Sequence, residues 1–153
     1  TGHMVFSTLH TNDAVGSVTR LVDMGVEPYL VASSMLGAMA QRLVRLNCPA
    51  CTESGVAVSP AIREAMGAGP EEVFYRGLGC PKCGNTGYRG RTLVSELFVP
   101  DEAIQDLIGD GASDHQIRQK AQAEGMRSLN QAALELARQG LTSLEEAHSV
   151  RLA

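Results

Sequence analysis

The four cysteines of the sequence form two Cys-x-x-Cys pairs that could hold a metal ion. The first pair is Cys48-Pro-Ala-Cys51 and the second pair is Cys80-Pro-Lys-Cys83. Together they offer four thiolates, the complete ligand set of a tetrahedral zinc site with Zn–S bonds of about 2.3 Å. Because no position would stay open for water, the pattern predicts a structural zinc centre rather than a catalytic one. Two disulfides or a redox dithiol are the alternatives.

Residues beside the two pairs suit such a centre. Pro49 and Pro81 stiffen the turn inside each pair, and Gly84 allows the backbone to fold back so that amide N–H groups point at sulfur. A Zn(Cys)₄ centre is negatively charged, and nearby basic side chains would offset that charge. The basic residues that lie close enough in sequence to do so are Arg45, Lys82, Arg89 and Arg91.

Composition limits the class of protein. A chain of 153 residues with 44% hydrophobic residues can bury a real core, and its length alone predicts one domain. The net charge of −4 and the absence of Trp argue against nucleic acid as the main partner. The sequence contains neither an apolar run of membrane-spanning length nor the pattern of a signal peptide, so we expect a soluble, cytoplasmic protein.

The first segment, residues 1–47, is typical of part of a larger α/β domain. Residues 4–9 are almost continuously apolar, which predicts a strand buried on both faces of a parallel sheet. A helix capped by Asn12 or Asp13 should follow, and Pro28 should begin a second, longer helix. The apolar stripe expected on that second helix consists of Leu36, Met39 and Leu43. Since one parallel strand cannot close a sheet, we expect the missing strands upstream.

The middle segment, residues 48–91, is expected to fold around the metal. It contains a short predicted helix over 60–66 and a Gly-rich loop over 67–70, with too little apolar content to fold alone. Metal binding would supply the missing folding energy. Residues 92–99 then predict a strand that returns to the core.

The last third of the chain predicts short helices near 101–109, 114–124, 129–139 and 143–150. Capping boxes are expected at Ser113 with Gln116, Ser128 with Gln131, and Thr142 with Glu145, and stops at Gly125 and Gly140. The side chains expected to face inward are Ile104, Leu107, Ile108, Ile117, Ala121, Leu129, Ala133 and Leu136.

Polar residues after the first predicted strand could bind an anion. His10 and Thr11 would lie at the carboxyl edge of the sheet, where open α/β sheets bind ligands and a helix N-terminus favours phosphate. The alternative is that His10 and Asn12 only end a strand and cap a helix, and that Gly2-His3-Met4 is a cloning remnant. The phosphate-loop pattern G-x-x-x-x-G-K-[ST] is absent from the sequence, so this chain alone should not hydrolyse a nucleotide.

The order of several sequence blocks resembles that of the type II secretion ATPases, the secretion motors of the GspE/PulE type. The blocks are TGH and STLHTN near the start, TRLVDMGVEP at 19–28, AQRLVR at 40–45, GYRGRT at 87–92, EL at 96–97, EGMRSL at 124–129 and GLTSLEE at 140–146. The resemblance covers nearly the whole chain and makes the cloning-remnant interpretation unlikely. One departure is Leu93-Val94-Ser95, where the family usually has Gly-Ile-Tyr.

The resemblance implies an α/β fold, the C-terminal part of a RecA-like P-loop ATPase core. Residues 1–47 would be a partial motor core with a His box, 48–91 an inserted tetracysteine zinc module, and 92–153 a returning strand and a helical C-terminal subdomain. The parent would bind ATP and Mg²⁺, act as a homo-hexamer and drive pseudopilus assembly. It would be cytoplasmic and peripheral at the bacterial inner membrane, held there by the platform proteins of the secretion system.

The resemblance also implies roles for particular residues. His3, Thr8 and His10 would sense the γ-phosphate and its attacking water. Arg20, Arg89 and Arg91 would lie in the vicinity of the nucleotide. The phosphate loop and the Mg²⁺-binding acids precede this region in the family, so the fragment alone is predicted to be inactive.

Two other functions stay open at this point. The chain could be a fragment of a type IV pilus assembly ATPase, which shares the cysteine pairs. It could also be a free-standing zinc scaffold for protein–protein interaction.

Overall fold

The computed structural model describes residues 2–151 and divides into two compact units. The first unit consists of the residues up to Ala40 together with Leu97–Met126, and the second of Gln41–Glu96 together with the residues from Arg127 onward. Two long strands, β1 (Ala38–Asn47) and β4 (Tyr88–Phe98), pair with each other and lie mostly in the second unit. The predicted division into 1–47, 48–91 and 92–153 follows motif order and stays a prediction.

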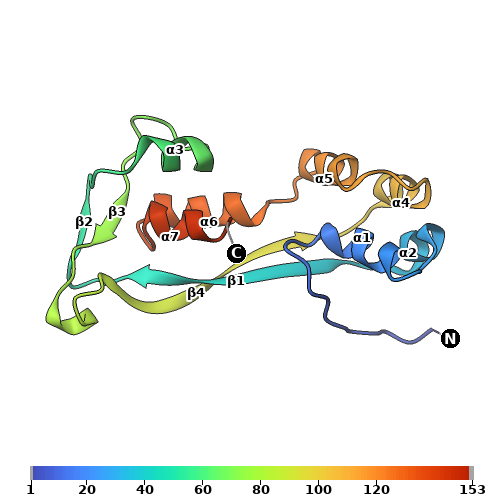
Figure 1. The fold of residues 1–153 in the computed structure, drawn as a ribbon, viewed down its shortest axis with the longest axis horizontal. Helices are drawn as coiled ribbons and strands as arrows, with labels where there is room; N and C mark the ends of the chain where they lie inside the picture. Colours follow the sequence, from blue (N-terminus) through green and yellow to red (C-terminus); the bar gives the residue numbers. More distant parts are fainter. Residues whose placement is uncertain (1, 152–153) are drawn as a thin grey trace. The chain divides into compact units, whose positions relative to one another are not determined.

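Helices build the first unit (Figure 1). They are α1 (Gly16–Asp23), α2 (Pro28–Ser34), α4 (Glu102–Gly109) and α5 (Asp114–Ala123). Helix α4 packs on both α2 and α5, and α1 packs on α2 and α5. The side chains buried between them include Val18, Val31, Ile104, Ile108, Ile117 and Ala121. The predicted helices near 101–109 and 114–124 are therefore confirmed, as are the inward positions on them except Leu107, which is half-buried.

Local hydrogen bonds explain where these helices start and stop. The Asp13 carboxylate accepts a bond of 2.9 Å from the Gly16 amide, just before α1. Ser113 and Gln116 form the predicted capping box at the start of α5. Gly25 follows α1 with φ of +92°, and the next amide, that of Val26, donates to the Leu21 carbonyl. This is the glycine-terminated helix end that the sequence predicted.

The strand predicted over residues 4–9 is wrong for this chain. These residues lie in neither a helix nor a strand, and Met4, Val5 and Phe6 are 65%, 77% and 91% exposed. A strand needs neighbours to take up its backbone hydrogen bonds. Among residues 2–151 the strands pair only as β1 with β4 and β2 with β3, so this segment has no neighbour to join.

The helix predicted from Pro28 begins there, but its predicted length is wrong. Helix α2 ends at Ser34, and strand β1 occupies the positions of the expected stripe. Met39 and Leu43 are exposed, while Ala40 and Val44, the residues directly after each of them, are buried. This alternation has a period of two, the period of a strand. The same residues also have the helical spacing on which the prediction was based. Leu36, the first residue of the expected stripe, is 68% exposed.

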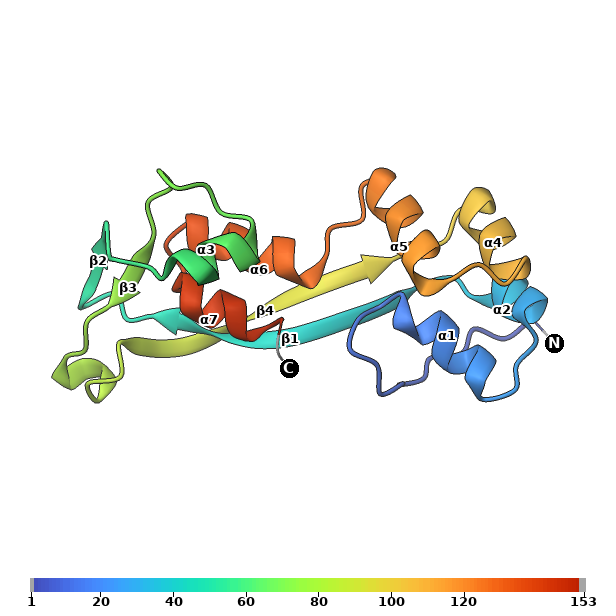
Figure 2. The same cartoon turned by 45° about the horizontal axis from the view of Figure 1, so that its top comes forward.

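The second unit combines the cysteine-bearing loops with three helices (Figure 2). Strands β2 (Thr52–Ser54) and β3 (Tyr75–Gly77) pair antiparallel, with Thr52 opposite Gly77 and Ser54 opposite Tyr75. Helix α3 (Pro60–Met66) packs on α6 (Leu129–Arg138) and α7 (Leu144–Ser149), which also pack on each other. The short 3₁₀ turn η1 (Pro81–Cys83) carries the second cysteine pair.

Most predicted elements of the second unit are confirmed. Helix α3 has the predicted bounds, and α6 starts with the predicted capping box of Ser128 and Gln131. Strand β4 begins at Tyr88, four residues earlier than predicted. Leu129 and Ala133 are buried as expected, whereas Leu136 is half-buried.

The third predicted capping box is wrong. The residue that caps α7 is Ser143, whose hydroxyl accepts a bond of 3.1 Å from the Glu146 amide. Thr142 lies one residue before this cap, and its hydroxyl donates to the Arg45 carbonyl at 2.7 Å. None of the helices in the described part of the chain has the length and apolar character of a membrane span.

Candidate metal centre

The four cysteine sulfurs lie within 4.8 Å of one another in the second unit. The Sγ–Sγ distances are 3.9 Å for Cys48 and Cys80, 3.9 Å for Cys51 and Cys83, and 3.8 Å for Cys80 and Cys83. A tetrahedron with Zn–S bonds of about 2.3 Å has sulfur–sulfur edges of about 3.8 Å. A disulfide instead needs about 2.05 Å. The spacing therefore fits one metal ion shared by both pairs and does not fit two disulfides.

Backbone amides point at the sulfur of Cys83, as the sequence predicted for a thiolate centre. The Cys80 amide donates to Cys83 Sγ at 3.2 Å, and the Gly87 amide donates to the same atom at 3.3 Å. Gly84 adopts φ of +62° directly after this cysteine, which turns the chain back over the sulfur. Such bonds stabilise the charged form of a metal-binding thiol and fix its orientation.

Two glycines allow the segments around the cluster to approach closely. A Cβ atom on Gly77 would come within 1.9 Å of the Gly87 carbonyl oxygen, and one on Gly87 within 2.2 Å of the Gly77 oxygen. The Gly87 carbonyl in turn accepts a bond of 2.8 Å from the Cys48 amide. Direct backbone contact thus joins the first pair, β3 and the start of β4. Nothing in the sequence spacing of Gly77 and Gly87 links them, so this contact was not predicted.

The thiols differ in acidity. Burial alone would raise the pKa of Cys83, but the amide bonds from Cys80 and Gly87 outweigh it and lower the pKa to about 6. Burial raises the pKa of Cys51 to about 11, and bonds with the neighbouring thiols add to the rise. A bound divalent cation would displace the remaining protons, because metal binding and thiol deprotonation are linked. The donor set therefore fits zinc, which would act as a four-way cross-link without an open position.

One of the basic residues expected to offset the charge, Arg45, is paired with another side chain. The Arg45 guanidinium forms an ion pair of 2.6 Å with Glu146 and lies 4.1 Å from the centre of the Tyr88 ring. This pair raises the pKa of Arg45. Arg45 thus serves the contact with α7, whereas Lys82, Arg89 and Arg91 are exposed.

The residues predicted to face a nucleotide are all accessible. His3, Thr8 and His10 are exposed in the segment without helix or strand, and Arg20 is exposed on α1 of the same unit. Arg89 and Arg91 are exposed on β4 in the second unit. Only the four cysteines are brought together as a set, and the nucleotide roles stay a prediction.

A buried carboxylate was not predicted as a site residue. Glu96 on β4 is 1% exposed and accepts a bond of 3.2 Å from the Leu129 amide, at the start of α6. A buried charge is costly unless polar groups surround it, and the positive end of a helix is a favourable partner. The sequence signal was an acidic residue within the apolar run TLVSELFV.

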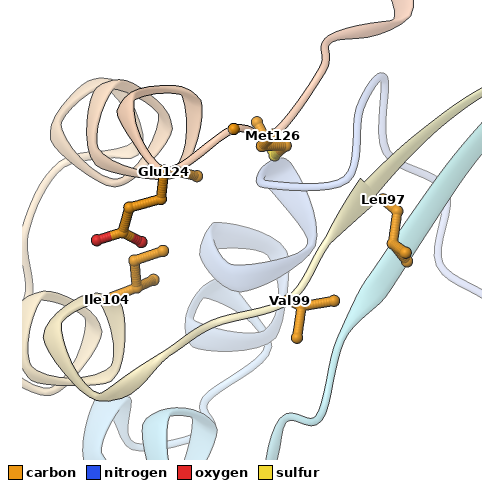
Figure 3. A pocket seen from close by; sticks show the side chains of 7 residues that line it. Leu97, Val99, Ile104, Glu124 and Met126 are labelled. Carbon is orange, nitrogen blue, oxygen red and sulfur yellow. The ribbon is translucent and has the colours of Figure 1, made fainter.

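A small cavity of about 210 Å³ lies in the first unit (Figure 3). Its wall is mainly apolar and includes Leu97, Val99, Ile104 and Met126. The one charged side chain on the wall, Glu124, pairs with Lys120 at 2.7 Å. This lining has no second polar group positioned for chemistry, so the cysteine cluster remains the better-formed site.

The fold is similar to part of a solved motor protein. The crystal structure of the pilus retraction motor PilT with bound ADP matches 98% of this chain and 33% of that chain, with a TM-score of 0.61 and 25% sequence identity. The chain belongs to the family of type II/IV secretion system proteins, whose family model matches residues 1–149. The resemblance inferred from the sequence blocks is therefore confirmed.

Two kinds of relative share this region. The chain is 49% identical over 148 residues to the type II secretion system ATPase E of Vibrio cholerae, a match that covers 95% of this chain and 29% of that protein. It is 42% identical over 150 residues to the type IV pilus assembly ATPase PilB of Thermus thermophilus, covering 95% of this chain and 17% of that protein. The chain thus spans less than a third of the length of either relative.

Proposed function

We propose that this chain is part of the cytoplasmic ATPase that powers type II protein secretion by assembling a pseudopilus. The observation that carries the proposal is the 49% identity to a type II secretion ATPase over 95% of the chain. The four cysteines would bind a structural Zn²⁺, and their sulfur spacing of 3.8–3.9 Å supports this.

In the parent, the first segment would complete a RecA-like core that binds ATP and Mg²⁺. His3, Thr8 and His10 would contact the γ-phosphate and the attacking water, and Arg20, Arg89 and Arg91 would lie near the nucleotide. The high exposure of Met4, Val5 and Phe6 supports this proposal, because contiguous apolar side chains are normally covered by protein. Neighbouring strands of the parent would cover them.

The parent would work as a homo-hexamer on the cytoplasmic face of the inner membrane, attached through the platform proteins of the secretion system. The support for this is the kinship with secretion ATPases, whose work requires a multi-protein complex. The net charge of −4 is consistent with protein partners rather than nucleic acid.

A type IV pilus assembly ATPase is the second candidate. It is favoured by the 42% identity to PilB and by the structural match to PilT. A free-standing zinc scaffold has less support, since every relative named here is a motor ATPase or a secretion protein.

Complementation distinguishes these candidates. The full-length protein, expressed in a strain that lacks its own secretion ATPase, should restore export of a secreted enzyme and not the pili of a strain that lacks its pilus assembly ATPase. The reverse result would favour the pilus function. Restoration of neither, combined with no ATP hydrolysis by the purified full-length protein, would favour the scaffold.

A further inference from the structure

At the end of strand β1, a residue that contacts a turn and a metal-ligand candidate are neighbours in the sequence of the second unit. Cys48 supplies a sulfur to the cluster, and Asn47 directly before it binds the turn between α6 and α7. The Asn47 amide donates to the Leu141 carbonyl at 2.8 Å, and its side-chain nitrogen donates to the Gly140 carbonyl at 3.0 Å. Cys48 is thus one residue away from two hydrogen bonds that hold this turn.

Strand β4 repeats the arrangement. Gly87 holds the cluster, since its amide donates to Cys83 Sγ and its carbonyl accepts from the Cys48 amide. The next residue, Tyr88, makes a hydroxyl–hydroxyl bond of 2.6 Å with Ser143. Ser143 is the N-cap of α7, so the second strand also connects the cluster to the start of this helix.

An ion pair with one buried end completes the joint between the strands and α7, since the Glu146 side chain is 9% exposed and the Arg45 side chain 55%. The Arg45 amide donates to Glu146 Oε1 at 2.9 Å, and the Arg45 guanidinium donates to Glu146 Oε2 at 3.0 and 2.6 Å. Glu146, Ser143 and Asn47 are 8%, 0% and 7% exposed. Water cannot easily replace these bonds, and breaking them would leave buried polar groups without partners.

Helix α7 depends on such contacts because it has only six residues. A helix of this length is not stable on its own in water, where nucleation costs more than a few backbone bonds return. The remaining ion pair to this helix, between Arg76 and Glu145 at 3.2 Å, joins side chains that are 40% and 30% exposed. An exposed pair of this kind contributes little. The bonds made by the buried residues Asn47, Ser143 and Glu146 therefore dominate the polar contacts that position α7.

We propose that Asn47 and Tyr88 are positioning residues through which a metal ion bound by the four cysteines fixes the turn 140–143 and the start of α7. This inference rests on the zinc-binding part of the proposed function. It states that metal binding stabilises one defined part of the second unit, the turn 140–143 and the start of α7. A coupling of this kind is reciprocal. The metal orders α7, and the docked α7 in turn strengthens metal binding.

Hydrogen–deuterium exchange on the purified full-length protein tests the first direction. Zinc content is measured first, and exchange of residues 140–150 is then compared between zinc-loaded protein and protein stripped with a chelator. We expect exchange there to accelerate at least about tenfold on stripping, within the range of typical coupling energies, while α4 and α5 of the first unit stay unchanged. Absence of zinc would overturn the metal assignment itself. Zinc present with unchanged exchange over 140–150 would overturn only the coupling.

Two variants that each lose one tyrosine hydroxyl test whether the coupling between the metal and α7 passes through Tyr88. Tyr88→Phe removes the bond to Ser143, and Tyr75→Phe is the matched control in the same unit, with its ring against Gly140. Competition with a colorimetric zinc chelator should show affinity weakened about fivefold in Tyr88→Phe and unchanged in Tyr75→Phe. Asn47→Ala should weaken zinc binding further, while still binding one ion per chain. Equal affinities for Tyr88→Phe and Tyr75→Phe, together with a zinc-dependent exchange over 140–150 that Tyr88→Phe leaves intact, would show that these residues do not carry the coupling.

Discussion

The cysteine cluster and the segment around His10 differ in how completely this chain builds them. The cluster is closed within the second unit, because two strands, a 3₁₀ turn and two glycines bring all four sulfurs within 4.8 Å. The segment of residues 2–13 has neither helix nor strand, and its apolar side chains are exposed. Local sequence is sufficient for a metal site with short ligand spacing. The nucleotide site proposed for this segment would need neighbouring strands, and residues 2–13 alone do not form it.

Of the changes proposed below, removal of the metal should have the largest effect on stability. The double change Cys80→Ser and Cys83→Ser, or full chelation, should unfold residues 48–91 and lose most of the metal's contribution, on the order of 10 kcal/mol in small zinc-organised modules. Elemental analysis and circular dichroism are the measurements, and reloading the chelated protein with zinc is the control. A module that keeps its structure without metal would contradict the proposed centre.

Disrupting the close approach of Gly77 and Gly87 should have the next largest effect on stability. Gly77→Ala places a Cβ atom against the Gly87 carbonyl, so we expect a loss of about 3–4 kcal/mol in the free energy of unfolding. Gly67→Ala is the control, because its φ is +70° and no atom lies within 4 Å of the added Cβ. That change should cost only about 1–2 kcal/mol. Denaturant titrations of both variants give the comparison, and equal losses would show that the close approach is not required.

The variant His10→Ala, made in the full-length protein, tests the role of the segment around His10. If His10 contacts the reacting phosphate there, kcat for ATP hydrolysis should fall at least about tenfold, or about 1.4 kcal/mol of barrier, with a smaller change in nucleotide affinity. His115→Ala, at an exposed position on α5, is the matched control. Residues 1–153 alone should not hydrolyse ATP, since positioning of the phosphates and Mg²⁺ supplies most of the catalysis. An unchanged kcat in His10→Ala would reduce this residue to a structural one.

Acid should have the smallest effect on stability, through the ion pair between Glu72 and Arg138. The hydrogen bond from Arg138 and then that from the Gly69 amide lower the pKa of Glu72 to about 2. Because the folded-state pKa lies below the ordinary value of 4.5, this contribution is complete above about pH 4.5 and disappears as the pH falls toward 2.

Arg138→Ala should therefore reduce stability at pH 6 by about 1 kcal/mol or less, since the pair is partly exposed, and by less at pH 3. Lys120→Ala, which breaks an ion pair on α5, is the control for general surface effects. Urea titrations at the two pH values measure the difference. A loss that grows as the pH falls would contradict the assignment.

The sequence predicted elements well where the signals were local. Capping boxes located α5 and α6 within a residue or two, and the cysteine spacing located the metal site. It failed where distant pairing decides the outcome. Residues 36–43 carry both helical and alternating apolar spacing, and only pairing with β4 selects the strand. The Asn47 and Tyr88 contacts were also out of reach, because they join residues about 50 to 90 positions apart.

The contact between Gly77 and Gly87 also limits how this protein can evolve. Each position excludes a side chain because of the backbone of the other, so a substitution at one cannot be rescued by a smaller residue at its partner, which is already glycine. Drift at these two positions is therefore blocked from both directions, unlike at a pair of packed side chains, where a loss of volume on one side can be matched by a gain on the other. Sequence variation in this module should accumulate on its outer loops and leave these two sites fixed.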